Sequence, residues 1–284
     1  MTLAISKPLK EKNAIESVAF AIVCQETFNA TSIAAIQRAF DSFVDELPGI
    51  EPIHAKVFNI NQTQGLKVDP TQYAIGFSRF HAHSNGMHSW RFNAQANMLI
   101  VTCFDYTNWD QVSPQAFKYL SAAISELEPS NKVIEVGFQM VDKFIYEPNI
   151  SASSYSVHEV FRRECQYLTT KAASSGLLWH VYQGWFQDAE GFSSESAKIL
   201  HQLNLSNAEE TLADINRLST IIDHRASIRF MPDSTPVKNL LELDGSGIAM
   251  NERLFNELRI QHKNIIGNLL NDEKLRSIGF IGAT

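Results

Sequence analysis

The residues best suited to chemistry gather in one stretch, RFHAHSNGMHSWRF, residues 79–92. It holds three of the nine histidines of the chain, His81, His83 and His88. The Asn85-Gly86 pair is typical of a two-residue β-hairpin turn, because both residues adopt positive φ at low cost. Such a turn places His83 opposite His88, and since side chains alternate along a strand, all three imidazoles then lie on one face.

A fourth candidate ligand lies in the strand that follows the hairpin. If residues 94–97 form the next turn, Phe92 pairs with Leu99 and His88 pairs with Cys103. Imidazole nitrogens and a thiolate suit zinc, at bond lengths of roughly 2.0–2.3 Å, and directly opposed Cβ atoms lie about 4.5–5.5 Å apart. The predicted metal ligands are therefore His81, His83, His88 and Cys103, with zinc as the ion and activation of water as the chemistry.

A competing interpretation of the same stretch needs no metal. Hairpin tips face solvent, where histidine is an ordinary polar residue, and Cys103 can serve as a small buried hydrophobe. The hairpin contains no Asp or Glu, although metal-binding histidines are usually oriented by such a partner. We favour this interpretation and expect no cofactor, with zinc as the alternative.

Three further candidate sites, one glycine-containing turn and two histidines, have weaker support. The turn in LELDGSGIAMNE, residues 241–252, could present backbone amides to a phosphate, but it lacks the third glycine of a dinucleotide fingerprint and has no Walker lysine. We expect a turn that leads into a helix, with nucleotide sensing at Asp244–Gly247 as a minor alternative.

Asp223 and His224 are adjacent on one strand and point apart, so they cannot form a dyad by themselves. His262 lies near an apolar helical stripe, where a hydrogen-bonded, half-buried histidine is expected.

The segment LLWHVYQGWF, residues 177–186, is unusually rich in aromatic residues. In a strand, Trp179 and Trp185 share one face, and Tyr182 and Phe186 share the other. Two apolar faces predict a central strand covered on both sides. An exposed aromatic face would instead mark a partner site.

The elements that position these residues follow from hydrophobic periodicity. Alternation from Val18 to Cys24 predicts a strand, and three- and four-residue spacing from Ile33 to Leu47 predicts a helix that ends before Pro48. Ser113 and Pro114 are suitable as the N-cap and first residue of a second helix. The other predicted elements are strands at 53–60, 73–82, 87–94, 97–106, 134–146, 177–187, 198–205, 219–231 and 237–243, and a helical segment from Ile248.

Strands grouped together, with helices between and after them, predict an α+β fold of antiparallel sheets with helices packed on a face. The segment PNISASSYS, residues 148–156, is polar and rich in serine, which is typical of a linker. We therefore expect two α+β halves, an N-terminal domain at 1–150 and a C-terminal domain at 151–284 that ends in helices. A long surface loop at 148–156 is the alternative.

Composition excludes several classes of function. The net charge is −7 and the 24 Lys and Arg residues are scattered, so general nucleic-acid binding is not expected. A local basic patch at Arg217, Arg225 and Arg229 is left open. No run approaches 18 apolar residues, as a membrane span requires, and residues 1–13 lack the apolar core of a signal peptide. Three widely spaced cysteines argue against a disulfide framework and for a reducing compartment. We expect a soluble cytoplasmic protein.

One resemblance covers nearly the whole chain. The run SWRFNAQANMLIVTCFDYTNW, followed by a helix and then VIEVGFQMVDKFIYEP, resembles an uncharacterised, sporadically distributed prokaryotic family of about this length. Its members often begin with a strand like AIESVAFAIV and end with a helix like LFNELRIQHKNIIGNLLNDEKLRSIG. The family has no established activity, so the resemblance implies no catalytic residue or cofactor. Its patchy distribution implies a link to mobile elements or defence loci.

The sequence contains no nucleophile elbow, zincin helix or kinase motif. The expected function is therefore that of a non-enzymatic binding or regulatory component. The resemblance implies that this component belongs to a mobile-element or defence locus. We expect it to act through a protein partner or through self-association at uncovered strand edges. The alternative is a metal-dependent enzyme that uses the His/Cys cluster of the 73–106 β-meander.

Overall fold

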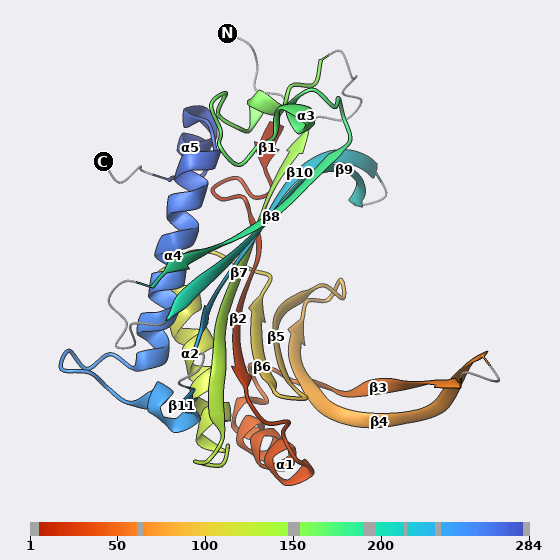
Figure 1. The fold of residues 1–284 in the computed structure, drawn as a ribbon, viewed down its shortest axis with the longest axis vertical. Coiled ribbons are helices and arrows are strands. Elements are labelled where there is room, and N and C mark those ends of the chain that lie inside the picture. Colours follow the sequence, from red (N-terminus) through yellow and green to blue (C-terminus); the bar gives the residue numbers. More distant parts are fainter. Residues whose placement is uncertain are drawn as a thin grey trace.

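The structure is a computed structural model that describes residues 6–61, 65–146, 154–189, 197–212, 215–230 and 234–280. Its fold is mixed α+β and is built on one large antiparallel sheet, in the order β3-β4-β5-β6-β2-β7-β10-β9-β8, with β1 and β11 paired to β7 (Figure 1). The strands are β1 (Ser6–Pro8), β2 (Ile15–Cys24), β3 (Gly49–Asn61), β4 (Gly65–Ala82), β5 (His88–Gln95), β6 (Met98–Cys103), β7 (Lys132–Tyr146), β8 (Trp179–Asp188), β9 (Lys198–Leu212), β10 (Ile215–Arg229) and β11 (Thr235–Pro236).

Two long helices pack against the sheet. Phe20 of β2 contacts Phe117 of α2 and Phe255 of α4, with ring centroids 5.9 and 5.2 Å apart. Phe20 is fully buried, and Figure 1 shows α2 and α4 running along the same side of the strands. The helical elements are α1 (Ala30–Ala39), η1 (Phe40–Phe43), α2 (Trp109–Ser125), η2 (Val157–Glu159), α3 (Thr170–Ala173), η3 (Val237–Leu241), α4 (Met250–Leu269) and α5 (Asp272–Ser277).

Most of the predicted elements are present, and two assignments are wrong. Helix α2 begins before the predicted Ser113-Pro114 start, because the Asn108 side chain accepts a hydrogen bond from the Gln111 amide, 3.1 Å away, and caps the helix there. The segment 237–243, predicted as a strand, forms the 3₁₀ helix η3 over its first five residues. Its buried residues, Val237 and Leu240, are three apart, which is the 3₁₀ period.

Strand β7 lies between β2 and β10, so strands from residues 1–150 and from residues 151–284 join in one sheet. The register is continuous over eleven β7–β10 pairs, from Ser219 opposite Ile145 to Arg229 opposite Glu135. Most of the predicted linker, residues 148–153, lies outside the described residues. The boundary at 150/151 stays a prediction.

Strand β8 is the last strand on its side of the sheet and pairs with β9. Trp179 is buried, as expected for one face. On the other face, Tyr182 is 61% exposed and Phe186 is 62% exposed. The prediction of a central strand covered on both sides is therefore wrong, because apolar alternation identifies the two faces of a strand but not its position in the sheet.

Candidate functional site

The histidine hairpin has a longer turn than the sequence predicts. The His83 amide donates to the Met87 carbonyl at 2.8 Å, and the Gly86 amide donates to the His83 carbonyl at 2.9 Å. Gly86 has a φ of +82°, which glycine adopts without steric cost. The loop therefore contains three residues, 84–86, and His83 lies opposite Met87 rather than His88. Three-residue loops with a residue of positive φ are the next most common hairpin type after the two-residue turn.

The longer turn changes the position of His88. His88 pairs with Ala82, and a register shift separates this pair from His81 and Trp90. Its ring packs edge-on against Phe80, with centroids 4.7 Å apart. His81 and His88 are thus divided between the two faces of the hairpin, since Phe80 and His81 are neighbours on one strand.

Cys103 is not beside any of the three histidines in the register of the sheet. It pairs with Trp90, and Val101 rather than Leu99 pairs with Phe92. Cys103 is fully buried, and burial raises the pKa of its thiol to about 12. The pairing of His88 with Cys103 is therefore wrong, and the four predicted ligands His81, His83, His88 and Cys103 do not converge. Within the described residues, no group of three or more His, Cys, Asp or Glu side chains is placed to hold a metal ion.

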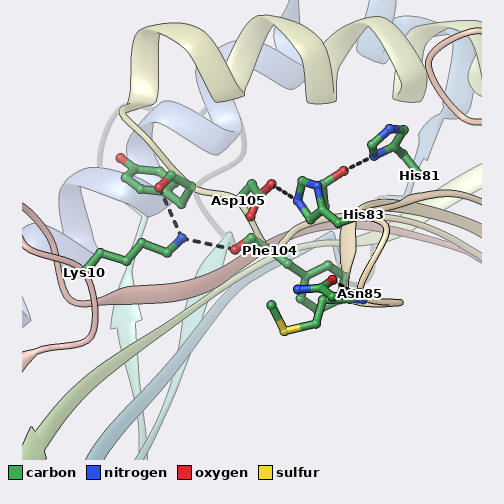
Figure 2. A network of polar contacts seen from close by, with 9 residues as sticks. Lys10, His81, His83, Asn85, Phe104 and Asp105 are labelled. Atoms are coloured by element: carbon green, nitrogen blue, oxygen red, sulfur yellow. Dashed lines mark hydrogen bonds and ion pairs between the residues drawn. The ribbon is translucent and has the colours of Figure 1, made fainter. Parts of the chain in front are cut away.

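The histidines that remain on the hairpin tip form a polar network instead (Figure 2). His83 Nε2 contacts the Asp105 carboxylate, and His81 Nδ1 contacts Ser89 Oγ at 2.6 Å. Lys10 Nζ donates to the backbone carbonyls of Phe104 and Tyr106, at 3.1 and 3.3 Å. Figure 2 shows these contacts on both sides of the segment that follows β6, residues 104–106. The network holds that segment in place, and the segment in turn forms a wall of a neighbouring pocket.

This pocket lies between helix α4, the start of β2 and the segment after β6, and its volume is about 420 Å³. Its size falls within the range of small-molecule sites, roughly 300–1,000 Å³. Apolar side chains contribute much of the lining, including Ile15, Trp109, Met140, Ile266 and Phe280. We call it the α4 pocket.

Three cationic side chains line the α4 pocket, namely Lys12, Arg259 and Lys263. The Arg259 guanidinium lies over the Trp109 ring, 4.7 Å from its centroid, and Lys263 Nζ lies 5.4 Å from the centroid of Phe280. Across the part of the chain that the structure describes, none of the three cations forms an ion pair with a carboxylate. Asp110 and Asp142 also line the pocket, so its three cations outnumber its carboxylates by one.

The pocket also reaches three buried polar groups, Tyr106, Asp142 and His262. Burial raises the pKa of Tyr106 to about 12, so its hydroxyl stays a neutral donor at neutral pH. Asp142 is 3% exposed, and its Oδ2 atom lies 3.4 Å from His262 Nε2. Within the described residues this oxygen accepts no hydrogen bond. A buried acceptor without a donor costs free energy, and a ligand that supplies an N–H or O–H group would remove that cost.

Behind the pocket, His262 is the first of three buried histidines in a row. His262 Nδ1 lies 3.2 Å from His224 Nδ1, and His224 Nε2 lies 3.2 Å from His201 Nδ1. The row ends where His201 stacks on Trp185, with centroids 5.0 Å apart. We call His262, His224 and His201 the histidine row. It crosses from α4 over β10 and β9 to β8, starting at Asp142 of β7.

The Asp142 carboxylate gives the histidine row a direction. The 3.4 Å approach of His262 Nε2 to Asp142 Oδ2 is too poorly aligned to be a hydrogen bond. Because an ionised carboxylate only accepts, this approach still favours the tautomer with the proton on Nε2, which leaves Nδ1 as an acceptor. His224 then donates from Nδ1 and accepts through Nε2, so His201 carries its proton on Nδ1. This order leaves His201 Nε2 as a bare acceptor, and that buried atom indeed has no partner among the described residues. Both nitrogens of His262 thus face protein groups, which favours binding over general base catalysis at this site.

The remaining phosphate candidate, the Asp244–Gly247 turn, is closed by its own carboxylate. Asp244 Oδ1 accepts from the Ser246 and Ile248 amides, at 2.8 and 3.2 Å. The Gly247 amide donates to the Asp244 carbonyl at 2.9 Å. The turn leads into α4, as expected, and the amides of Ser246, Gly247 and Ile248 are already used.

Sequence reasoning missed the histidine row, although a signal for part of it was present. His201 alternates in phase with Ile199, Leu203 and Leu205, and His224 alternates in phase with Ile222 and Ala226. A histidine in the apolar phase of a strand predicts a buried imidazole. His262 is buried and hydrogen-bonded, which confirms the expectation for that residue.

Comparisons with protein-family models, with curated proteins and with solved structures found no match. The family resemblance therefore stays an expectation. Among the described helices, none is long and apolar enough to cross a membrane.

Proposed function

We propose that the protein is a binding protein for a small organic anion, and that the ligand occupies the α4 pocket. The observation that carries this proposal is the presence of three cations without an ion-pair partner, Lys12, Arg259 and Lys263, around one cavity of about 420 Å³ whose lining holds only two carboxylates, Asp110 and Asp142. A site that holds cations without carboxylate partners attracts an anionic ligand, and arginine in particular binds carboxylate and phosphate through two parallel hydrogen bonds.

The lining defines the chemistry of the ligand more closely. Trp109 and Phe280 offer ring faces to an apolar or planar body. At the buried end, Asp142 Oδ2 lacks a donor, so the ligand carries an N–H or O–H group there. The ligand class is thus a molecule with a carboxylate or phosphate at one end and a donor group at the other, such as an amino acid or a nucleoside monophosphate.

This proposal agrees with the binding or regulatory role expected from the sequence. A binding pocket needs no nucleophile, and the chain has no catalytic motif. The engagement of both His262 nitrogens by protein groups also supports a role in shaping the pocket.

The test is a thermal-shift screen of the full chain with inorganic phosphate, amino acids and nucleoside monophosphates. A ligand at about 100 times its Kd stabilises the folded state by about 2.7 kcal/mol, which raises Tm by several degrees. We expect Arg259→Met and Lys263→Met each to weaken binding of the best probe at least tenfold, because a charge-assisted hydrogen bond contributes about 1.5–3 kcal/mol.

The control is Arg276→Met, since Arg276 is an exposed cation of α5 outside the pocket. It should bind the probe as the parent does. A screen in which no anionic probe raises Tm, or a shift that survives both pocket substitutions, would overturn the proposal.

A further inference from the structure

We propose that the ligand of the α4 pocket is a free α-amino acid with an apolar side chain, bound at its ammonium group by Asp142 and at its carboxylate by Arg259. This inference rests on the proposed function and deepens it by naming the ligand. The starting observation is that charge in this pocket is separated by depth. Asp142 is buried, whereas Lys12 and Lys263 are exposed and Arg259 is half-buried.

The buried Asp142 carboxylate lacks a cationic partner. Its side chain is 4% exposed, and the described residues give it no lysine or arginine partner. His262 Nε2 approaches Asp142 Oδ2 at 3.4 Å without forming a hydrogen bond. A buried charge costs free energy unless a partner of opposite charge compensates it and hydrogen bonds satisfy it. The missing partner is therefore a cation with N–H donors, and an ammonium group of the ligand is both.

Arg259 supplies the opposite charge on the α4 wall of the pocket. Arg259, His262 and Lys263 are three and four residues apart, so their side chains lie on one face of the helix. Arg259 and Asp142 line the same cavity without forming an ion pair, so their charged atoms are farther apart than ion-pair contact. The arginine fork binds a carboxylate through two parallel hydrogen bonds. An α-amino acid carries its ammonium and its carboxylate on the same carbon atom, so one small ligand pairs both charges.

The apolar part of the lining selects the side chain of the ligand. It is formed by aliphatic and aromatic residues, Ile15, Trp109, Met140, Ile266 and Phe280. A charged or hydroxylated ligand side chain would leave its polar atoms without partners against these groups, which costs free energy. An apolar side chain would bury its surface there, which is favourable. Phenylalanine, leucine and methionine are therefore the expected ligands.

A nucleoside monophosphate suits the buried end of the pocket less well. Its hydroxyl and base N–H groups are neutral donors, which satisfy a hydrogen bond but leave the charge of Asp142 without a counter-charge. The ammonium group of an amino acid supplies the donor and the counter-charge together. The buried carboxylate thus separates two ligand classes that the pocket cations alone would both accept.

The experiment is isothermal titration calorimetry of the full chain with L-phenylalanine, L-leucine and L-methionine. The best of the three is compared with two analogues that each lack one charged group, the deaminated carboxylic acid and the decarboxylated amine. The amino acid should bind more tightly than either analogue by about tenfold or more, because only the amino acid forms charge-assisted hydrogen bonds with both Asp142 and Arg259.

Asp142→Asn removes the buried charge with little change in volume. This variant should lose the preference for the amino acid over the deaminated acid. Continued binding of the deaminated acid would show that the variant is folded. Asp110→Asn is the matched control, because Asp110 is an exposed carboxylate of the same pocket, and it should keep the preference of the parent.

The comparison of analogues on the parent chain decides the question even if Asp142→Asn does not fold. A deaminated acid that binds as tightly as the amino acid, or a preference that survives in Asp142→Asn, would overturn the inference and leave an anion-binding pocket. Binding of nucleoside monophosphates without binding of any of the three amino acids would have the same meaning. Failure of every anionic probe would overturn the proposed function as well.

Discussion

At the scale of single residues, the histidine row is the least expected feature of this protein. Imidazoles lose free energy on burial unless both ring nitrogens find partners. Asp142 at one end and Trp185 at the other, with nitrogen-to-nitrogen distances of 3.2 Å between the rings, supply most of those contacts. Burial lowers the pKa of His201 to about 4. Burial, reinforced by His262 and His201, also holds the pKa of His224 well below its usual value.

These depressed pKa values predict that acid destabilises the fold. Between pH 6.5 and about 4, the unfolded chain binds a proton at His201 and the folded chain does not, so the free energy of unfolding falls as pH falls through this window. The loss from His201 alone is about 3 kcal/mol, since one pKa unit corresponds to about 1.4 kcal/mol. Urea denaturation at pH 7, 6, 5 and 4 measures it.

The variant His201→Phe keeps the stack on Trp185 and removes the titrating group. Its stability should therefore depend less steeply on pH than that of the parent. His54→Gln, at an exposed position of β3, should leave the slope unchanged. Equal slopes for parent and His201→Phe would show that His201 is not the group responsible.

At the scale of elements, the hairpin β4–β5 shows how one residue in a turn changes a site. The third loop residue, Gly86, moves His88 to the other face from the one that a two-residue turn predicts. Further from the turn, the same two strands approach closely at Gly76. A Cβ atom placed there would lie 1.9 Å from the Ala94 carbonyl oxygen, which is a clash with backbone and not with a flexible side chain.

The close approach predicts that Gly76→Ala is strongly destabilising. The strands must separate to admit the methyl group, and overpacking of this kind costs about 1–3 kcal/mol. Gly137→Ala in β7 is the matched control, because the nearest atom to its Cβ would be 3.7 Å away, which is ordinary contact. Urea denaturation of both variants should give a large loss for Gly76→Ala and a change near zero for Gly137→Ala. A tolerated Gly76→Ala would mean that the strands are not held this closely.

At the scale of the whole molecule, one buried lysine connects strands from both sides of the expected 150/151 boundary. Lys143 of β7 is 4% exposed, and its Nζ lies 2.5 Å from Glu16 of β2 and 3.0 Å from Glu210 of β9. Although burial opposes its charge, hydrogen bonds to the two carboxylates raise the pKa of Lys143. The cation holds together two carboxylates that would otherwise repel each other.

We therefore expect Lys143→Met to lower the free energy of unfolding by about 1–3 kcal/mol, because its removal leaves Glu16 and the less exposed Glu210 without their cation. Lys118→Met is the control. Lys118 pairs with Glu46 at the surface, with both side chains more than a third exposed, and such pairs contribute about 0–1 kcal/mol. Denaturant midpoints at neutral pH distinguish the two cases, and equal losses would contradict a structural role for the buried cation.

The sequence by itself determined the elements and their buried faces. Alternation in β2, β7, β9 and β10, and helical spacing in α4, follow from side chains that must leave water, and that information is local. Only the tertiary structure decided which strands are neighbours, since alternation does not specify order or register. The α4 pocket and the histidine row depend on that order, because Asp142, His201, His224 and His262 come from β7, β9, β10 and α4, and only the tertiary structure brings these four elements together. The edge position of β8 was decided in the same way, so its exposed aromatic face could not be distinguished from a buried one by sequence.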